Sequence, residues 1–152
     1  MMLATSKRKV KAPGGVILYR GPSELAGKPI IVVATGLSKG SANAKTGAAI
    51  QVWILADGIH PNDAAHSGAD VSVCGTCVHR PREVSPGVWK LGSCYVNLSQ
   101  APAQVHDGLV RGIYPKFNPV RHGKLFRGRM IRLGAYGDPA AVPLSVIAKV
   151  CK

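Results

Sequence analysis

Three cysteines and a histidine near the middle of the chain have the residue types and the spacing that a metal site needs. Cys74 and Cys77 form a Cys-x2-Cys turn, His79 follows closely, and Cys94 comes later in the chain. Thiolates bind zinc tetrahedrally, and a Cys-x2-Cys turn places two sulfur atoms on one ion. The sequence therefore predicts a zinc site formed by Cys74, Cys77, Cys94 and His79.

The same cysteines allow other interpretations. Three thiolates could hold an iron–sulfur cluster and leave one iron open to a ligand. Cys74 and Cys77 could instead exchange between thiol and disulfide, which requires a lowered thiol pKa. All three could also be ordinary buried cysteines, so the zinc site is one of four hypotheses.

A second cluster of chemistry-bearing residues follows in the C-terminal third. Between residues 108 and 137 there is no acidic residue. The basic residues of this tract are Arg111, Lys116, Arg121, Lys124, Arg127, Arg129 and Arg132. Four rings, those of Tyr114, Phe117, His122 and Phe126, are interleaved with them. Because Arg and Lys neutralise phosphates and aromatic rings stack on exposed bases, the tract predicts binding to single-stranded or irregular nucleic acid. The alternative is a solvated loop whose rings anchor it to the core.

A third candidate site is the glycine-containing turn that follows Arg132. A strand that ends in such a turn, before an Asp and a helix begun by Pro139, is where α/β folds place site residues. Arg132, Tyr136 and Asp138 are therefore candidates for lining a pocket, and Arg132 could pair with Asp138. The favoured role for Asp138 is simpler, because an Asp before a proline is typical of a helix N-cap.

Local patterns predict the elements that must position these residues. Short apolar, β-branched runs bounded by Gly and Pro predict strands, and apolar residues at helical spacing predict helices. The strands are expected at 15–19, 29–35, 50–56, 88–91 and 130–133, and the helices at 60–66, 99–111 and 143–150. This order favours an α/β fold in which an N-terminal antiparallel hairpin is followed by βα units with some parallel pairing. The cysteine-rich loop lies among those units.

Composition bounds the class of protein. A chain of 152 residues with 46% hydrophobic residues can form one core, so we expect a single α/β domain over residues 15–152 after a disordered basic arm at 1–14. The formal net charge of +13 favours a polyanionic partner. No run of 18 apolar residues is present, so no membrane-spanning helix is expected. The basic N-terminus lacks the apolar stretch of a secretory signal, so we expect reduced thiols inside a cell.

Three motifs carry a resemblance to a known group of proteins. They are Cys-x2-Cys-x-His-Arg from Cys74, Cys-Tyr-Val-Asn from Cys94, and Arg-Leu-Gly-Ala-Tyr-Gly-Asp-Pro-Ala-Ala-Val-Pro from Arg132. From Gly21 onward the chain resembles a family of uncharacterised proteins encoded by tailed phages and prophages. The family implies no activity, and its members extend further, so the chain looks short at its C-terminus. A more distant similarity is to phage proteins with a partial α/β barrel of the radical S-adenosylmethionine type, whose Cys-x3-Cys-x2-Cys signature is absent here.

These observations give three hypotheses about function. The first is a phage-encoded, zinc-stabilised protein that binds DNA or RNA. The second is an iron–sulfur or zinc enzyme, and the third is a virion or interaction protein in which the cysteines brace the fold. The resemblance implies the cytoplasm of an infected bacterial host, or the virion, as the location. A phage or host protein is a further possible partner.

Overall fold

The centre of the molecule is a four-stranded mixed sheet. The computed structural model describes residues 11–38 and 44–151. The strands are β1 (Gly15–Pro22), β2 (Pro29–Thr35), β3 (Ile50–Ala56) and β6 (Ile131–Tyr136), in the order β1-β2-β3-β6. β2 pairs antiparallel with β1 and β3, and β6 joins β3 in parallel. The antiparallel N-terminal strands and the α/β class are thus confirmed. Most of the expected basic arm, residues 1–10, lies outside the described residues.

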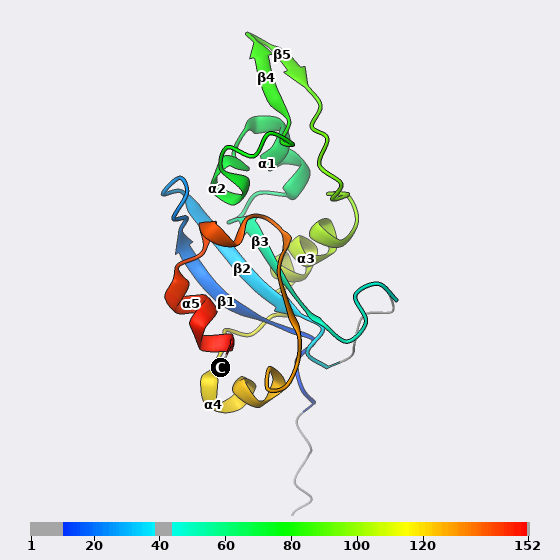
Figure 1. Ribbon diagram of the computed structural model, residues 1–152, viewed down its shortest axis with the longest axis vertical. Helices are drawn as coiled ribbons and strands as arrows, with labels where there is room; N and C mark the ends of the chain where they lie inside the picture. The colour runs from blue at the N-terminus through cyan, green and yellow to red at the C-terminus, as the bar shows by residue number, and fades with distance from the viewer. Residues whose placement is uncertain (1–10, 39–43, 152) are drawn as a thin grey trace, which may run out of the picture.

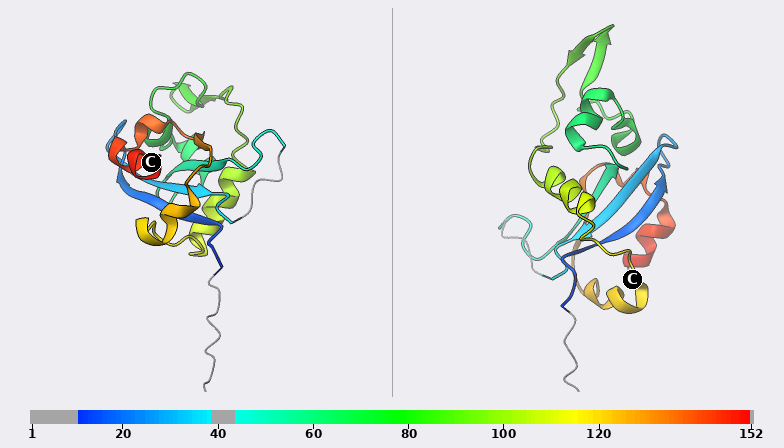
Figure 2. Two further views of the ribbon diagram at one scale, coloured as in Figure 1. Left: turned by 60° about the horizontal axis from the view of Figure 1, so that its bottom comes forward. Right: turned by 180° about the vertical axis from the view of Figure 1, so that it is seen from behind.

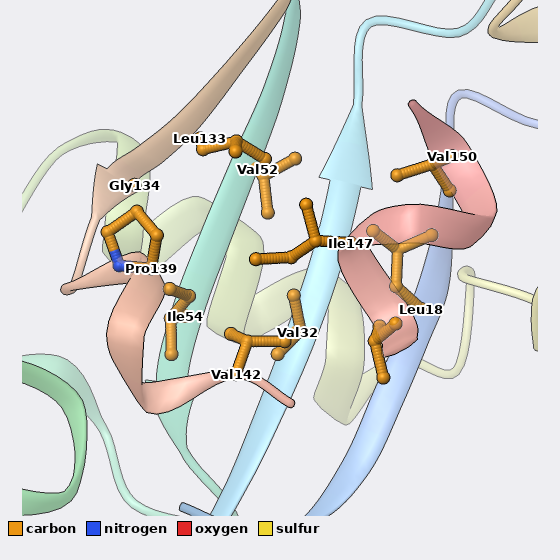
Figure 3. A pocket seen from close by; sticks show the side chains of 11 residues that line it. Leu18, Val32, Val52, Ile54, Leu133, Gly134, Pro139, Val142, Ile147 and Val150 are labelled. Carbon is orange, nitrogen blue, oxygen red and sulfur yellow. The ribbon is translucent and has the colours of Figure 1, made fainter. Parts of the chain in front are cut away.

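Helices cover both faces of this sheet. Every residue of β3 is buried, and because successive residues point to opposite faces, the strand needs cover on both sides. The helix α5 (Leu144–Val150) lies on one face and α3 (Ala101–Val110) on the other (Figures 1 and 2). Figure 3 shows apolar side chains of the sheet, such as Val32 and Ile54, meeting Ile147 of α5. Only about 10 Å³ of free space remains between them, so this region is packed core.

The predicted strand at 88–91 exists but does not join the central sheet. It is β5 (Val88–Lys90) and pairs antiparallel with β4 (Arg82–Ser85). This hairpin projects from the molecule beyond the helices α1 (Pro61–Ser67) and α2 (Val71–Cys74) (Figure 1). All of its strand residues are exposed. Because Gly87 adopts a φ of 75°, the chain reverses direction between the two strands, and β5 pairs with β4, its neighbour in the sequence. The expected series of βα units is therefore reduced to one parallel strand, β6.

The residues between α3 and β6 run along the free edge of β1. The backbone N–H of Ile17 donates to the carbonyl of Pro115 at 2.9 Å, and that of Phe117 donates to the carbonyl of Ile17 at 2.8 Å. The helix α4 (Pro119–His122) and the 3-10 turn η1 (Gly123–Leu125) follow. Asn118 caps α4, because its side chain accepts hydrogen bonds from the N–H groups of Val120 and Arg121. The edge of β1 is thereby covered by this segment.

The remaining local predictions are largely confirmed. The helices expected at 60–66, 99–111 and 143–150 are α1, α3 and α5, with ends that differ by at most two residues. The register of β6 on β3 shifts between Arg132 and Tyr136, and in this stretch Gly134 has a φ of 67°, which favours glycine. Asp138 accepts a hydrogen bond from the N–H of Ala140 at 2.9 Å and caps η2 (Pro139–Ala141), as predicted. None of the helices in the described ranges has the length and apolar character that crossing a membrane requires.

Candidate functional site

The three cysteines lie at the base of the projecting hairpin. Cys74 ends α2 and is half-buried, whereas Cys77 and Cys94 are exposed. The N–H of Cys77 donates to the carbonyl of Cys74 at 3.1 Å, which closes the Cys-x2-Cys turn. After the hairpin the chain returns, and the N–H of Cys94 donates to the carbonyl of His79 at 3.1 Å. Backbone hydrogen bonds therefore fasten Cys94 to the segment that carries the other two thiols.

Gly92 makes this return possible. A Cβ atom at Gly92 would overlap the carbonyl oxygen of His79 and come within 2.7 Å of the backbone nitrogen of Pro81. Only a glycine lets the two legs of the hairpin approach so closely. The position of Cys94 beside the Cys-x2-Cys turn thus depends on Gly92.

Burial governs the chemistry of Cys74. Burial raises the pKa of its thiol to about 12, and the neighbouring Asp70, Cys77 and Cys94 add to the shift, while Arg80 opposes it. A raised pKa means that Cys74 is a neutral thiol at pH 7, which is the opposite of what redox exchange through an activated thiolate requires.

The side chains do not yet form a complete ligand set. In the described part of the chain, no three His, Cys, Asp or Glu side chains are grouped so that they could hold a metal ion. The Nδ1 atom of His79 lies 2.7 Å from the Oγ atom of Ser93, next to Cys94, and the imidazole is exposed. Zinc binding by Cys74, Cys77, Cys94 and His79 would therefore require the exposed side chains to rotate toward Cys74.

A buried ion pair supports the cysteine turn, and no sequence pattern pointed to it. Asp70 is 2% exposed, and its carboxylate accepts a hydrogen bond from the guanidinium of Arg80. Arg80 also donates to the carbonyl of Gly75 at 2.5 Å. The hydrogen bond to Asp70 raises the pKa of Arg80, so the guanidinium stays charged. The pair joins the residue before α2 to Arg80, three residues after the end of the cysteine turn.

A hollow of about 200 Å³ opens beside this pair. Cys74, Cys94, Arg80 and Tyr136 are among the residues that line it. Burial raises the pKa of the Tyr136 phenol, and the neighbouring Cys74 and Asp70 add to the shift, so the phenol stays neutral at pH 7. Asp138 does not line this hollow. The backbone N–H of Asp138 nevertheless donates to the carbonyl of Val73 at 2.8 Å, so the turn that ends at Asp138 lies beside Cys74, while the Asp138 carboxylate caps η2.

Five of the predicted phosphate-binding cations are available at the surface. Arg111, Lys116, Arg121, Lys124 and Arg127 are exposed, and none forms an ion pair with a described acidic residue. We call these five residues the basic surface. Arg121 lies in α4 and Lys124 in η1, and α4 is at the opposite end of the molecule from the β4–β5 hairpin (Figure 1). Lys116 and Arg127 flank these two elements in the sequence, and Arg111 follows α3.

Arg129 has a different role from the one predicted. Its guanidinium donates to the carbonyls of Gly36 at 2.7 Å, Ala48 at 2.6 Å and Leu37 at 3.3 Å. These carbonyls belong to both ends of the connection between β2 and β3. Arg129 is therefore a structural residue whose donors are already used, and it has little capacity for phosphate.

The rings of the basic tract anchor it to the core. Phe126 and His122 are buried, and Phe117 packs edge to face against Phe126 with ring centroids 5.6 Å apart. Tyr114 is half-buried, and burial raises the pKa of its phenol. Phe126 and His122 are therefore not exposed for base stacking, and these rings hold the segment against the core.

Arg132 lies in a second hollow, of about 350 Å³, that sequence reasoning did not identify. Its guanidinium donates to the amide oxygen of Gln51 at 3.4 Å and to the hydroxyl of Tyr95 at 3.3 Å. Trp53 and Asn97 also line this hollow, whereas Tyr136 and Asp138 do not. The three residues proposed for one pocket are therefore separated. The only sequence signal for Tyr95 was an aromatic residue in a polar loop directly after Cys94.

Comparison of the chain with protein-family models, with curated proteins and with solved structures finds no match.

Proposed function

We propose that the protein binds single-stranded nucleic acid through the basic surface. The observation that carries this proposal is that five exposed cations stand without acidic partners on a segment held in place by buried rings. All seven acidic residues of the chain lie outside residues 108–137, so nothing in this tract offsets its charge. Cations fixed in this way bind the phosphate backbone without first having to break ion pairs.

Zinc is proposed to brace the base of the hairpin. Cys74, Cys77 and Cys94 would supply thiolates, and His79 would supply the fourth ligand. The backbone hydrogen bond between Cys94 and His79 and the close approach at Gly92 support this set, because they already bring the two legs together. An iron–sulfur cluster on the same cysteines is the alternative. Metal analysis of protein purified without oxygen distinguishes them, because zinc is colourless and a cluster is brown and contains sulfide.

A salt titration tests the binding proposal. Each phosphate contact releases counterions, so five contacts to a single strand predict that log K falls with log salt concentration with a slope of about −3.5. Binding should be measurable at about 50 mM salt, and its absence there would overturn the proposal. Single-stranded and duplex oligonucleotides are compared under the same conditions.

Charge reversal locates the binding surface. Arg121→Glu with Lys124→Glu should weaken binding strongly and reduce the salt slope. Lys28→Glu with Lys90→Glu is the matched control with the same change in net charge, because Lys28 is exposed in the turn between β1 and β2 and Lys90 is exposed on β5, both away from α4. Equal effects of the two changes would mean that net charge, and not the basic surface, controls binding.

This function fits the location implied by the sequence resemblance, namely the cytoplasm of an infected bacterium or the virion that carries the genome. A role as a virion component or as a partner of a phage or host protein is the other candidate. Detection of the protein in purified particles tests it directly.

A further inference from the structure

The hollow at Arg132 combines groups that suit one nucleotide. Arg132 and Gln51 are partners in the parallel register of β6 and β3, so both side chains extend from the same face of the sheet. Gln51 is 7% exposed, and its amide oxygen accepts the hydrogen bond from Arg132. Trp53 forms part of the wall, and its indole N–H donates to the hydroxyl of Thr35 at 2.8 Å, which fixes the ring.

Tyr95 stands at this hollow as an exposed aromatic ring. It is 83% exposed, in contrast to the buried rings of the basic tract. The hydroxyl of Tyr95 accepts the hydrogen bond from Arg132. The backbone on either side of Tyr95 is fixed by hydrogen bonds at Cys94 and Asn97. Cys94 is fastened to His79, and the side chain of Asn97 accepts a hydrogen bond from the N–H of Ser99 at 3.1 Å. The ring therefore lies at the hollow and is largely exposed.

We infer that this hollow binds one nucleotide of a single strand, with the base stacked on Tyr95 and the phosphate against Arg132. The inference rests on the proposed function and adds a stacking site to it. The volume of about 350 Å³ falls in the range of small-ligand sites. A base inside a duplex has both faces covered by its neighbours, so this contact requires a single strand.

Substitutions of Tyr95 test the stacking contact. Tyr95→Ala should weaken binding of a single-stranded oligonucleotide of about 12 nucleotides by about tenfold or more. Tyr95→Phe keeps the ring and should bind within about threefold of the wild type. Duplex affinity should be unchanged in both variants. Trp89→Ala is the matched control, because Trp89 is exposed on the hairpin and does not line the hollow. Because Tyr95 is largely exposed, its removal should leave the melting temperature unchanged.

The outcomes separate this inference from the proposed function. If Tyr95→Ala binds single strands as the wild type does while Lys124→Glu loses affinity, the stacking site is wrong and the basic surface stands. If the wild type binds no oligonucleotide, both are wrong. An equal loss by Tyr95→Ala for single strands and duplex would also overturn the stacking site. As a second readout, Trp89→Phe leaves Trp53 as the sole tryptophan of the chain, so a mononucleotide bound in the hollow should change its fluorescence.

Discussion

Replacing Arg80 by Ala should destabilise the protein severely, although Arg80 lies outside the core. The change removes the ion-pair partner of Asp70. Asp70 is only 2% exposed, so its carboxylate is left buried without a positive charge beside it. Removing one partner of a buried ion pair costs about 3–5 kcal/mol. The side chain of Arg80 is 17% exposed, so water enters the space left by the guanidinium and partly solvates Asp70. We therefore expect a loss near the lower end, about 3 kcal/mol.

The loss is measurable in a thermal or denaturant unfolding experiment. For a domain of this size each kcal/mol lowers the melting temperature by about 2–4 °C, so Arg80→Ala should melt roughly 6–12 °C below the wild type. The measurement is circular dichroism in the presence of a chelator, so that metal binding at the nearby cysteines does not contribute. The double variant Asp70→Asn with Arg80→Ala should recover part of the loss, because a neutral amide costs less to bury than an unpaired carboxylate.

A double-mutant cycle refutes or supports this reasoning. Asp70→Asn, Arg80→Ala and the double variant together give the coupling free energy of the pair. A coupling below about 1 kcal/mol would be typical of an exposed ion pair and would refute the claim that burial makes this pair important. Arg20→Ala is the matched control, because Arg20 forms an ion pair with Asp57 at 3.1 Å in which the arginine side chain is 59% exposed. It should change the free energy of unfolding by less than about 1 kcal/mol.

Three further predictions concern the residues Arg129, Gly92 and Tyr136, which hold the basic tract and the cysteine region in place. Arg129→Ala should lower the free energy of unfolding by about 2–4 kcal/mol in a urea titration, because it leaves the carbonyls of Gly36 and Ala48 without their charged donor. Arg127→Ala, the control, should have almost no effect in the same titration. Gly92→Ala should separate the legs of the hairpin and weaken zinc binding in a competition assay with a chelator; unchanged affinity would contradict the role of the close approach at Gly92. Burial holds the Tyr136 phenol neutral in the folded state, while the unfolded chain ionises near pH 10, so the free energy of unfolding should fall as the pH rises above about 10. Tyr136→Phe should show a smaller fall in metal-free protein, and an identical pH profile would refute this.

Local sequence determined the elements whose formation depends on nearby residues. The β-branched runs at 29–35 and 50–56 predicted β2 and β3 with the bounds that the structure gives. Asp138 was predicted as a cap because capping involves only the next two residues. The Cys-x2-Cys turn is also local, since its hydrogen bond joins Cys77 to Cys74. Such features follow from residues a few positions apart.

The tertiary structure alone decided which side chains are free to act. Arg129 and Arg132 look alike in the sequence, yet Arg129 is engaged by the carbonyl of Gly36, 93 residues away, while Arg132 contacts Tyr95, 37 residues away. Phe126 and His122 of the basic tract were buried by packing against the core, and Tyr95 was left exposed at a hollow. Burial and partners of this kind depend on segments distant in the chain that meet only after folding. A local pattern can therefore predict that cations and rings are present, but packing decides which of them can reach a ligand.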